Sequence, residues 1–313
     1  MSPRVAYLGP EGTFTHQAAI DAIGGDAQLV PLPIVTQVYD GVEDGGFEYG
    51  IVAIESSVEG YVVPSLDALV AARNVVAIDE VFVEVAFDAM TVAGATGPFT
   101  EVTSHPHGLA QCQRFITERG LTEVPAASNA AAARDVQPHQ IALAPRIAAS
   151  LYDREIIDER VQDFHGARTR FLLITGREQA LAQRSRIETW QNDAGHTVRS
   201  MVAITPRITG PGVLARILGA LGGRGVNLSS LITRPLKALE GKYVFIMTVD
   251  AAPWDETLRS VIGGLIEAGD SVKTLGVFPS RGEIDATVDE ERIPPLSADA
   301  SSSPGDLERA LLW

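Results

Sequence analysis

The chain of 313 residues is poor in several residue types, and each shortage excludes a class of protein. A single cysteine rules out an intrachain disulfide framework and is typical of a reducing compartment. No run approaches the roughly 20 apolar residues of a membrane-spanning helix. Basic residues number 25 against 40 acidic ones, and the net charge of −15 disfavours binding to nucleic acid or to an anionic membrane.

Familiar catalytic motifs are also missing. One cysteine cannot build a Cys-His zinc site, and the sequence contains no H-E-x-x-H pattern, no Walker loop and no G-x-S-x-G elbow. The pair His105-Pro-His107 could contribute to a metal site, but such a pair more often forms part of a turn or pocket. We therefore predict no metal and no cofactor. The first residues lack the regions of a signal peptide, so we expect a cytoplasmic protein.

Charge is distributed in three blocks along the chain. Residues 1–196 carry a net charge of −13, residues 197–280 carry +3, and residues 281–313 carry −5. All three lysines lie in the middle block. With 45% hydrophobic residues, the chain has enough apolar material for substantial cores, and its length favours two domains. The steps in charge predict that the blocks are separate modules.

The first block alternates short apolar strands with helical patterns from Val5 to Thr175. One of the expected helices covers residues 107–119. This rhythm predicts largely parallel sheets with helices on both faces. Because ligands bind beyond the carboxyl ends of the strands in such folds, residues at strand-to-helix junctions are the candidates for function.

The remainder of the chain divides into three parts. Residues 177–196 are polar and predict a helical connector. Residues 197–280 follow a strand-helix-strand-strand-helix-strand order, which is typical of a ferredoxin-like fold. After Pro279 the chain is acidic and rich in proline and serine, so we expect residues 281–313 to be mostly disordered, with a short helix over residues 307–313.

Four junction motifs carry small hydroxyl groups, amides and arginines. The first allows an anion to approach a helix N-terminus, and the last places two arginines around a hydroxyl at the start of an apolar strand. Taken alone, each also fits an ordinary turn or helix cap. The four segments are Gly-Pro-Glu-Gly-Thr-Phe-Thr-His (9–16), Ile-Glu-Ser-Ser-Val-Glu-Gly (54–60), Thr-Ser-His-Pro-His-Gly-Leu-Ala-Gln-Cys (103–112) and Gly-Ala-Arg-Thr-Arg-Phe (166–171).

Together these motifs, in this order, resemble the signature motifs of prephenate dehydratase. Residues 197–280, with the run Gly-Pro-Gly-Val-Leu-Ala-Arg-Ile-Leu, resemble the ACT regulatory domain of that family. The resemblance extends to about Phe278, and it implies a monofunctional enzyme without a chorismate mutase domain. The family reaction converts prephenate to phenylpyruvate, water and carbon dioxide on the route to phenylalanine.

The resemblance implies an α/β fold with a two-lobed, periplasmic-binding-protein-like catalytic domain and a ferredoxin-like ACT domain. The catalytic domain would span 1–176. Its first lobe would comprise about 1–76 and 166–176, and its second lobe about 77–165. The chain would cross between the lobes near 75–80 and return near 165–170. The remaining divisions would be a connector (177–196), the ACT domain (197–280) and an acidic tail (281–313).

The resemblance also implies roles for individual residues. Thr169 matches the catalytic threonine, and Glu55 is a candidate proton donor if burial raises its pKa. Of the two arginines around Thr169, Arg170 is the one we expect to point inward. The substrate would contact Gly12, Thr13, Phe14, Ser56, Ser57, Ser104, His107, Gln111, Arg170 and Phe171, with no metal ion.

Two departures from the family pattern concern the site and its regulation. Ser56 stands where the family commonly has asparagine, and Ile232-Thr233-Arg234-Pro235 stands where it commonly has Glu-Ser-Arg-Pro. L-Phenylalanine would bind between subunits of a homodimer or homotetramer. Arogenate dehydration and an inactive amino-acid-sensing protein are the alternatives. The expected effector site comprises Gly212, Val213, Leu214, Asn227, Leu228, Ile232, Thr233, Arg234 and Pro235.

Overall fold

The computed structural model describes residues 2–194, 196–236, 239, 241–281 and 293–312. Residues 1–280 form one compact unit, and residues 281–313 form a second. Among the helices of the described residues, none has the length and apolar character needed to cross a membrane.

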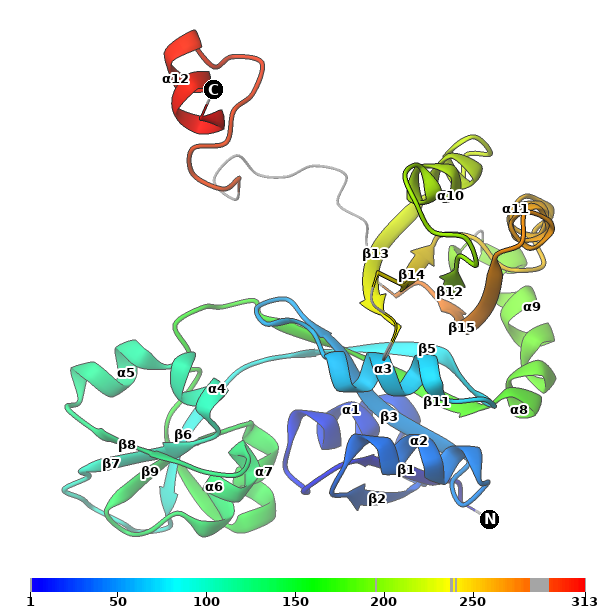
Figure 1. Ribbon diagram of the computed structural model, residues 1–313. Coiled ribbons are helices and arrows are strands. Elements are labelled where there is room, and N and C mark those ends of the chain that lie inside the picture. Colours follow the sequence, from blue (N-terminus) through cyan, green and yellow to red (C-terminus); the bar gives the residue numbers. More distant parts are fainter. Residues whose placement is uncertain (1, 195, 237–238, 240, 282–292, 313) are drawn as a thin grey trace. The chain divides into compact units, whose positions relative to one another are not determined.

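The first lobe is built on a parallel arrangement of β1 (Arg4–Leu8), β2 (Gln28–Leu32) and β3 (Tyr49–Ser56) (Figure 1). Side chains alternate along each strand, so Val5 and Tyr7 pack on one face and Ala6 on the other. Pro31 lies in β2, which ends the sheet. The helices of this lobe are α1 (Phe14–Ile23), α2 (Val35–Glu43) and α3 (Val63–Ala71), and β4 (Gly60–Tyr61) pairs with β3.

The second lobe is a five-stranded mixed sheet in the order β10-β6-β9-β7-β8. Its strands are β6 (Asp88–Val92), β7 (Glu101–Ser104), β8 (Thr122–Pro125), β9 (Gln140–Ala144) and β10 (Arg154–Asp158). Strand β7 is parallel to β8 and β9, as predicted, whereas β6 is antiparallel to β9 and β10. The helices are α4 (Pro106–Ala110), α5 (Gln113–Glu118), α6 (Asn129–Asp135) and α7 (Arg146–Tyr152).

The single helix expected at 107–119 is instead the pair α4 and α5. Asp163 explains the break, because its N–H donates to the carbonyl oxygen of Gln111 at 2.7 Å and its carboxylate accepts the Arg114 N–H at 3.1 Å. These contacts end one helix and begin the next. Cys112 lies at the break, fully buried, and burial raises the pKa of its thiol to about 12, so it is a packing residue.

Two antiparallel strands, β5 (Val75–Glu84) and β11 (Arg168–Gly176), lie side by side at the connection between the lobes. Strand β11 also pairs with β3. The crossing expected at 75–80 falls inside β5, which belongs to the first sheet, and the chain reaches the second sheet only at Asp88. Thr169 therefore lies on one of the strands that join the two lobes.

The C-terminal block, residues 198–279, has the predicted βαββαβ order and the sheet order β13-β14-β12-β15 of a ferredoxin-like fold. One face of this sheet packs on its two helices through residues such as Val202, Ile217 and Leu258. The elements are β12 (Val198–Thr205), α10 (Val213–Gly222), β13 (Leu228–Pro235), β14 (Tyr243–Val249), α11 (Glu256–Glu267) and β15 (Ser271–Pro279). The connector forms α8 (Arg177–Ala182) and α9 (Arg184–Ala194).

The C-terminal block and the first lobe share one ten-stranded sheet, which the steps in charge along the sequence did not suggest. Strand β15 runs parallel to β5, with Gly276 opposite Ala77. A Cβ atom on Gly276 would lie only 2.7 Å from the Ala77 Cβ and 3.0 Å from its carbonyl oxygen. Met201 and Leu275 of the block pack in the same core as Leu66 of the first lobe.

The second unit contains α12 (Pro304–Leu311). Ser303 begins this helix with a capping box, because its hydroxyl accepts the Asp306 N–H and the Asp306 carboxylate accepts the Ser303 N–H. The helix overlaps the one expected over 307–313. Of the tail expected to be disordered, residues 282–292 and 313 lie outside the described residues.

The substitution Gly276→Ala tests the close approach of β15 to β5. The added methyl group would overlap Ala77, and we expect a loss of about 1–3 kcal/mol in the free energy of unfolding. Gly264→Ala is the matched control, because Gly264 lies inside α11 with open space around it and alanine favours a helix. Urea unfolding of both variants measures the difference, and equal stabilities would contradict the tight contact.

Candidate active site

The loop before α1 is held by its own backbone amides. Gly12 has a φ of +83° and donates its N–H to His16 Nδ1 at 3.1 Å, and the Gly9 N–H donates to the Leu32 carbonyl at 2.9 Å. Burial lowers the pKa of His16, which favours the neutral ring that can accept this bond. Thr13 caps the helix by accepting the His16 N–H at 3.2 Å. Two of the amides expected to bind an anion are therefore already engaged.

The same loop contacts the second lobe directly. The Tyr152 hydroxyl donates to the Glu11 carbonyl at 2.7 Å. A Cβ on Gly12 would lie 3.2 Å from the Tyr152 ring and 3.4 Å from atoms of Ala130 and Ala148. Glycine at this position therefore allows the first lobe to approach the helices α6 and α7 of the second.

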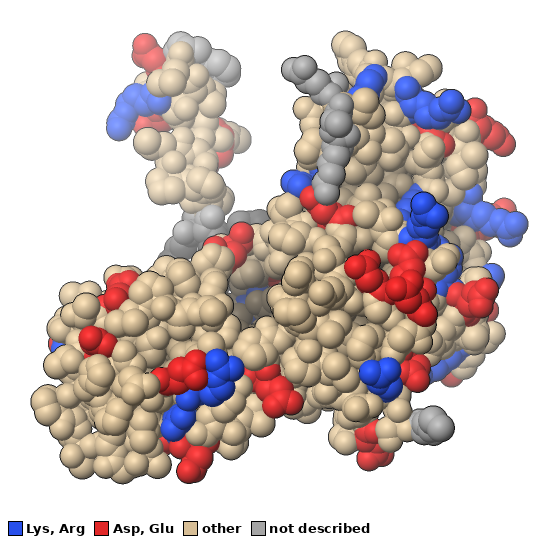
Figure 2. Space-filling model, turned by 60° about the horizontal axis from the view of Figure 1, so that its bottom comes forward, with Lys and Arg blue, Asp and Glu red and all other residues tan. Residues whose placement is uncertain are grey.

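Phe14 lies where the cores of the two lobes meet. Its ring packs against the buried clusters of both lobes and makes an edge contact with Phe87 at 5.5 Å between ring centroids. Figure 2 shows the surface hollowed between the lobes, with acidic and basic groups side by side on this face. A cavity of about 330 Å³ beside Phe14 is lined by Phe14, Gln17, Val83, Glu84, Ala86, Asp88, Pro145, Arg146, Ile147, Glu159 and Arg160.

Thr169 and Ser56 come together on the face of the sheet that carries Phe14. They are direct partners in the antiparallel pair of β11 and β3, and Val83 of β5 is opposite Thr169 on the other side. The Thr169 side chain is half-buried, and its hydroxyl makes no hydrogen bond within the described residues. Ser57 fixes the strand start, because its hydroxyl accepts the Arg168 N–H at 2.9 Å.

Glu55 and Arg170 lie on the opposite face of this sheet from Thr169. Side chains alternate along a strand, so neighbours of Thr169 and Ser56 point away from them. The Arg170 guanidinium is 10% exposed and lies 3.0 Å from the Glu55 carboxylate, which is 36% exposed. The structure thus places Glu55 in an ion pair, not in a buried position beside Thr169. Phe171 is 1% exposed and packs in the core.

The predicted residues of the second lobe differ in their accessibility. Ser104 is fully buried, and its hydroxyl lies 2.7 Å from the Leu143 carbonyl and 3.0 Å from Asn129 Oδ1. It therefore holds the turn before α4 and presents no hydroxyl to the cleft. His107 is exposed on α4, and Gln111 is half-buried at its end.

Sequence reasoning missed the arginines beside the cavity. Arg146 lies 2.8 Å from Asp88 and 2.7 Å from Glu159, and Arg160 pairs with Glu84. Arg146 lies two residues after the end of β9, so the rule that strand ends carry function could have identified it. Within the described part of the chain, no group of three or more His, Cys, Asp or Glu side chains could hold a metal ion.

Sequence reasoning also missed a buried chain of charges. Glu80 is fully buried, with Arg170 at 3.6 Å on one side and Arg199 at 3.4 Å on the other. Arg199 lies 2.9 Å from Asp250, which also accepts a hydrogen bond from the Asn227 side chain. This ion chain joins the strand of Thr169 to the C-terminal block. No local pattern in the sequence predicts it.

The residues predicted to bind an effector fall into two groups at opposite ends of β13. Gly212 caps α10 with a φ of +83°, and Val213, Leu214 and Leu228 pack on the core of the C-terminal block near Asn227. At the other end, Arg234 makes two contacts of 2.8 and 3.0 Å with Asp67 of α3. Ile232 packs against the shared core, whereas Thr233 and Pro235 are exposed.

Two α/β lobes with a cleft at their connection, joined to a ferredoxin-like block, define a two-lobed α/β protein with an appended C-terminal domain. A model of the prephenate dehydratase family matches residues 5–179. The prephenate dehydratase of Amycolatopsis methanolica is 31% identical over 290 residues, which cover 91% of each chain. The chain belongs to the prephenate dehydratase family.

Solved structures are similar over most of the chain. Prephenate dehydratase from Arthrobacter aurescens, in complex with L-Phe, is 26% identical with a TM-score of 0.76, and the match covers 92% of this chain and 94% of that one. GqqA, described as a novel type of quorum quenching acylase, is 25% identical with a TM-score of 0.76, covering 88% of this chain and 98% of that one.

The substitution Glu80→Gln tests the ion chain. It removes the carboxylate that two buried guanidinium groups share, while Arg170 keeps Glu55 and Arg199 keeps Asp250, so we expect the free energy of unfolding to fall by about 1–3 kcal/mol. Glu84→Gln is the control, because the ion pair of Glu84 with Arg160 is exposed to solvent and should contribute little. Urea unfolding at neutral pH compares the variants, and an unchanged Glu80→Gln midpoint would contradict the assignment.

Proposed function

We propose that the chain converts prephenate to phenylpyruvate, carbon dioxide and water. The Thr169 hydroxyl carries this proposal: it stands in the family's Thr-Arg-Phe motif, on a strand that joins the lobes, and has no hydrogen-bond partner in the described part of the chain. Ser56 lies beside it, and Phe14 and Val83 provide an apolar surface on the same face. A free hydroxyl beside an apolar wall suits a substrate with a ring and a ring hydroxyl.

Aromatisation of the ring drives the reaction. The bond from the ring to its carboxylate breaks and releases carbon dioxide, and its electron pair moves into the ring as the bond to the hydroxyl group breaks. The departing oxygen takes up one proton and leaves as water. Thr169 donates a hydrogen bond to this oxygen, and because threonine is a weak acid it positions or relays the proton instead of supplying it.

The other residues hold the substrate and the strand. In this proposal Ser56, Thr13 and Phe14 contact the ring end of the substrate. His107 of α4 and Gln111, the residue that ends α4, orient its pyruvyl end. Arg146 and Arg160 line the cavity beside Phe14, where each is paired with carboxylates of the same lining, so a substrate carboxylate would have to displace one of these pairs. From the opposite face of the sheet, Glu55 and Arg170 act by fixing β11 against β3.

The test is an assay of the purified chain with prephenate, read by the alkaline absorbance of phenylpyruvate. We expect Thr169→Ala to lower kcat by a factor of at least about 10², which is typical of one lost acid–base or hydrogen-bonding group. Thr169→Ser keeps the hydroxyl and should retain most of the activity. A silent wild-type enzyme would refute the function, and an active Thr169→Ala variant would remove Thr169 from the mechanism.

The same assay separates the alternatives. Arogenate differs from prephenate only at the amino or keto carbon, so the two substrates are compared directly by kcat/KM. Ligand binding without turnover would indicate an inactive sensing protein. Amide hydrolysis, suggested by the name of GqqA, needs an activated nucleophile. In the described residues neither a histidine nor a carboxylate is hydrogen-bonded to Thr169, so dehydration fits the site better.

We further propose that L-phenylalanine regulates the enzyme by binding between two ACT-like blocks of a homodimer or of a homotetramer. Strand β13 ends the sheet among the described strands, so its outer edge is available to a second copy. Leu228 and Arg234 are six residues apart on this strand, or about 20 Å. One chain cannot bring them to a single ligand, whereas antiparallel pairing of two β13 strands brings Asn227 of one copy near Arg234 of the other.

The substitution Asn227→Ala tests this arrangement. We expect it to raise the concentration of L-phenylalanine needed for half-maximal effect on prephenate turnover by at least about tenfold, the effect of losing one or two buried hydrogen bonds. Activity without the effector should change little, because Asn227 lies in the C-terminal block and its hydrogen bond to Asp250 is exposed to solvent. Light scattering should show at least a dimer, and a monomer that responds to L-phenylalanine would contradict binding between subunits.

A further inference from the structure

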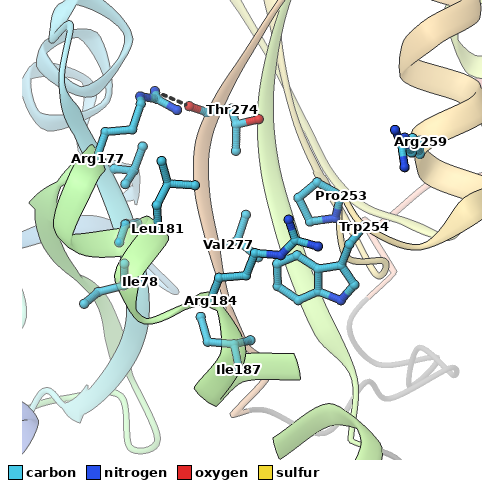
Figure 3. Close-up of a pocket in the computed structure, with 13 residues that line it drawn as sticks. Ile78, Arg177, Leu181, Arg184, Ile187, Pro253, Trp254, Arg259, Thr274 and Val277 are labelled. Atoms are coloured by element: carbon cyan, nitrogen blue, oxygen red, sulfur yellow. Dashed lines mark hydrogen bonds between the residues drawn. The ribbon is translucent and has the colours of Figure 1, made fainter. Parts of the chain in front are cut away.

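A second cavity lies between the first lobe, the connector and the C-terminal block, away from both Thr169 and β13. Its volume is about 420 Å³, within the range of small-molecule sites. Strand β5 contributes Val76–Ile78, and Thr274 and Val277 come from β15. The connector helices and the segment around Trp254 complete it, as Figure 3 shows. The cavity therefore contacts the first lobe, the connector and the C-terminal block.

Apolar side chains form much of this cavity. Ile78, Leu181, Ile187 and Val277 line it together with the Trp254 ring. The indole N–H of Trp254 donates to the Gln191 side chain at 2.9 Å, which fixes the ring plane. Leu181 is 65% exposed, although leucine gains from burial. A ligand with an apolar ring would cover this surface.

Three arginines give the cavity its charge. Arg184 lies over the Trp254 ring at 5.2 Å and pairs with Glu188 at 2.7 Å. Arg177 donates to the neutral Thr274 carbonyl at 2.9 Å. Within the described residues, neither Arg177 nor Arg259 has a carboxylate within ion-pair distance. Two positive charges are therefore left without an internal counter-ion.

The thirteen described residues that line the cavity include no aspartate or glutamate. An ammonium group would therefore meet arginines without a nearby carboxylate in the lining. This distinguishes the cavity from a site for an amino acid, which must satisfy both an ammonium and a carboxylate group. An acid without an amino group matches both the charge and the apolar surface.

We propose that this cavity binds an aromatic carboxylate that lacks an ammonium group, with the ring against Trp254 and Leu181 and the carboxylate towards Arg259 and Arg184. Planar guanidinium groups bind carboxylates through paired hydrogen bonds. Such a ligand would contact the first lobe, the connector and the C-terminal block at once. It is a second small-molecule site, separate from the proposed L-phenylalanine site.

The experiment is titration calorimetry of the full chain with 3-phenylpropionate, which is L-phenylalanine without its amino group. Binding should be weakened at least about tenfold by Arg259→Gln and by Arg184→Gln, the loss expected for one charge-assisted hydrogen bond. Arg224→Gln, at an exposed arginine outside the cavity, is the matched control and should bind normally. Both cavity arginines are exposed enough to be replaced without unfolding, which thermal melting verifies.

Two further ligands and a competition experiment with prephenate test whether the acid binds in this cavity. The neutral 3-phenylpropan-1-ol should bind at least about tenfold more weakly, and L-phenylalanine should bind with an affinity that Arg259→Gln does not change. The proposal is overturned if 3-phenylpropionate does not bind, or if it competes with prephenate and ignores both arginine substitutions. Either result leaves prephenate turnover itself untouched, so failure here is distinct from failure of the proposed function.

Discussion

The fully buried carboxylate of Glu80, between the guanidinium groups of Arg170 and Arg199, is the interaction on which the arrangement of the chain depends. A charge in this position is tolerable only when opposite charges and hydrogen bonds surround it. Because Arg170 is on β11, Glu80 on β5 and Arg199 on β12, the group fixes the strand of Thr169 against the C-terminal block. The position of the Thr169 strand and that of the C-terminal block therefore depend on one set of charges.

Close backbone contact supports the same assembly where no charges are involved. Gly12 lets the loop before α1 approach the second lobe, and Gly276 lets β15 approach β5. Lys273 adds a third kind of contact, because its ammonium group donates to the carbonyl oxygens of Val70 and Ala72 at the end of α3. The second lobe thus contacts the first at Gly12, where a small residue is needed. The C-terminal block contacts it at Gly276, where a small residue is needed, and at Lys273, where a long cationic side chain is needed.

The sequence predicted what depends on local pattern. Strand-helix alternation and the βαββαβ order follow from periodicity, and the resemblance to the family assigned Ser56 and Thr169 to one site. The motif did not predict which face of the sheet each of its residues occupies. Thr169 and Arg170 are neighbours in it, and because side chains alternate along a strand, they lie on opposite faces of the sheet. Contacts between distant segments could not be predicted from local sequence pattern, because residues such as Glu80 and Arg199 are separated by 119 positions.

The two ends of the ten-stranded sheet differ in a way that limits its growth. At one end β2 contains Pro31, which has no N–H to offer a further strand. At the other end β13 has a proline only at its last residue, Pro235, so its preceding residues all carry a peptide N–H. If two copies join through β13, each remaining outer end is the proline-bearing strand β2, which disfavours the addition of a further strand and growth into a fibre.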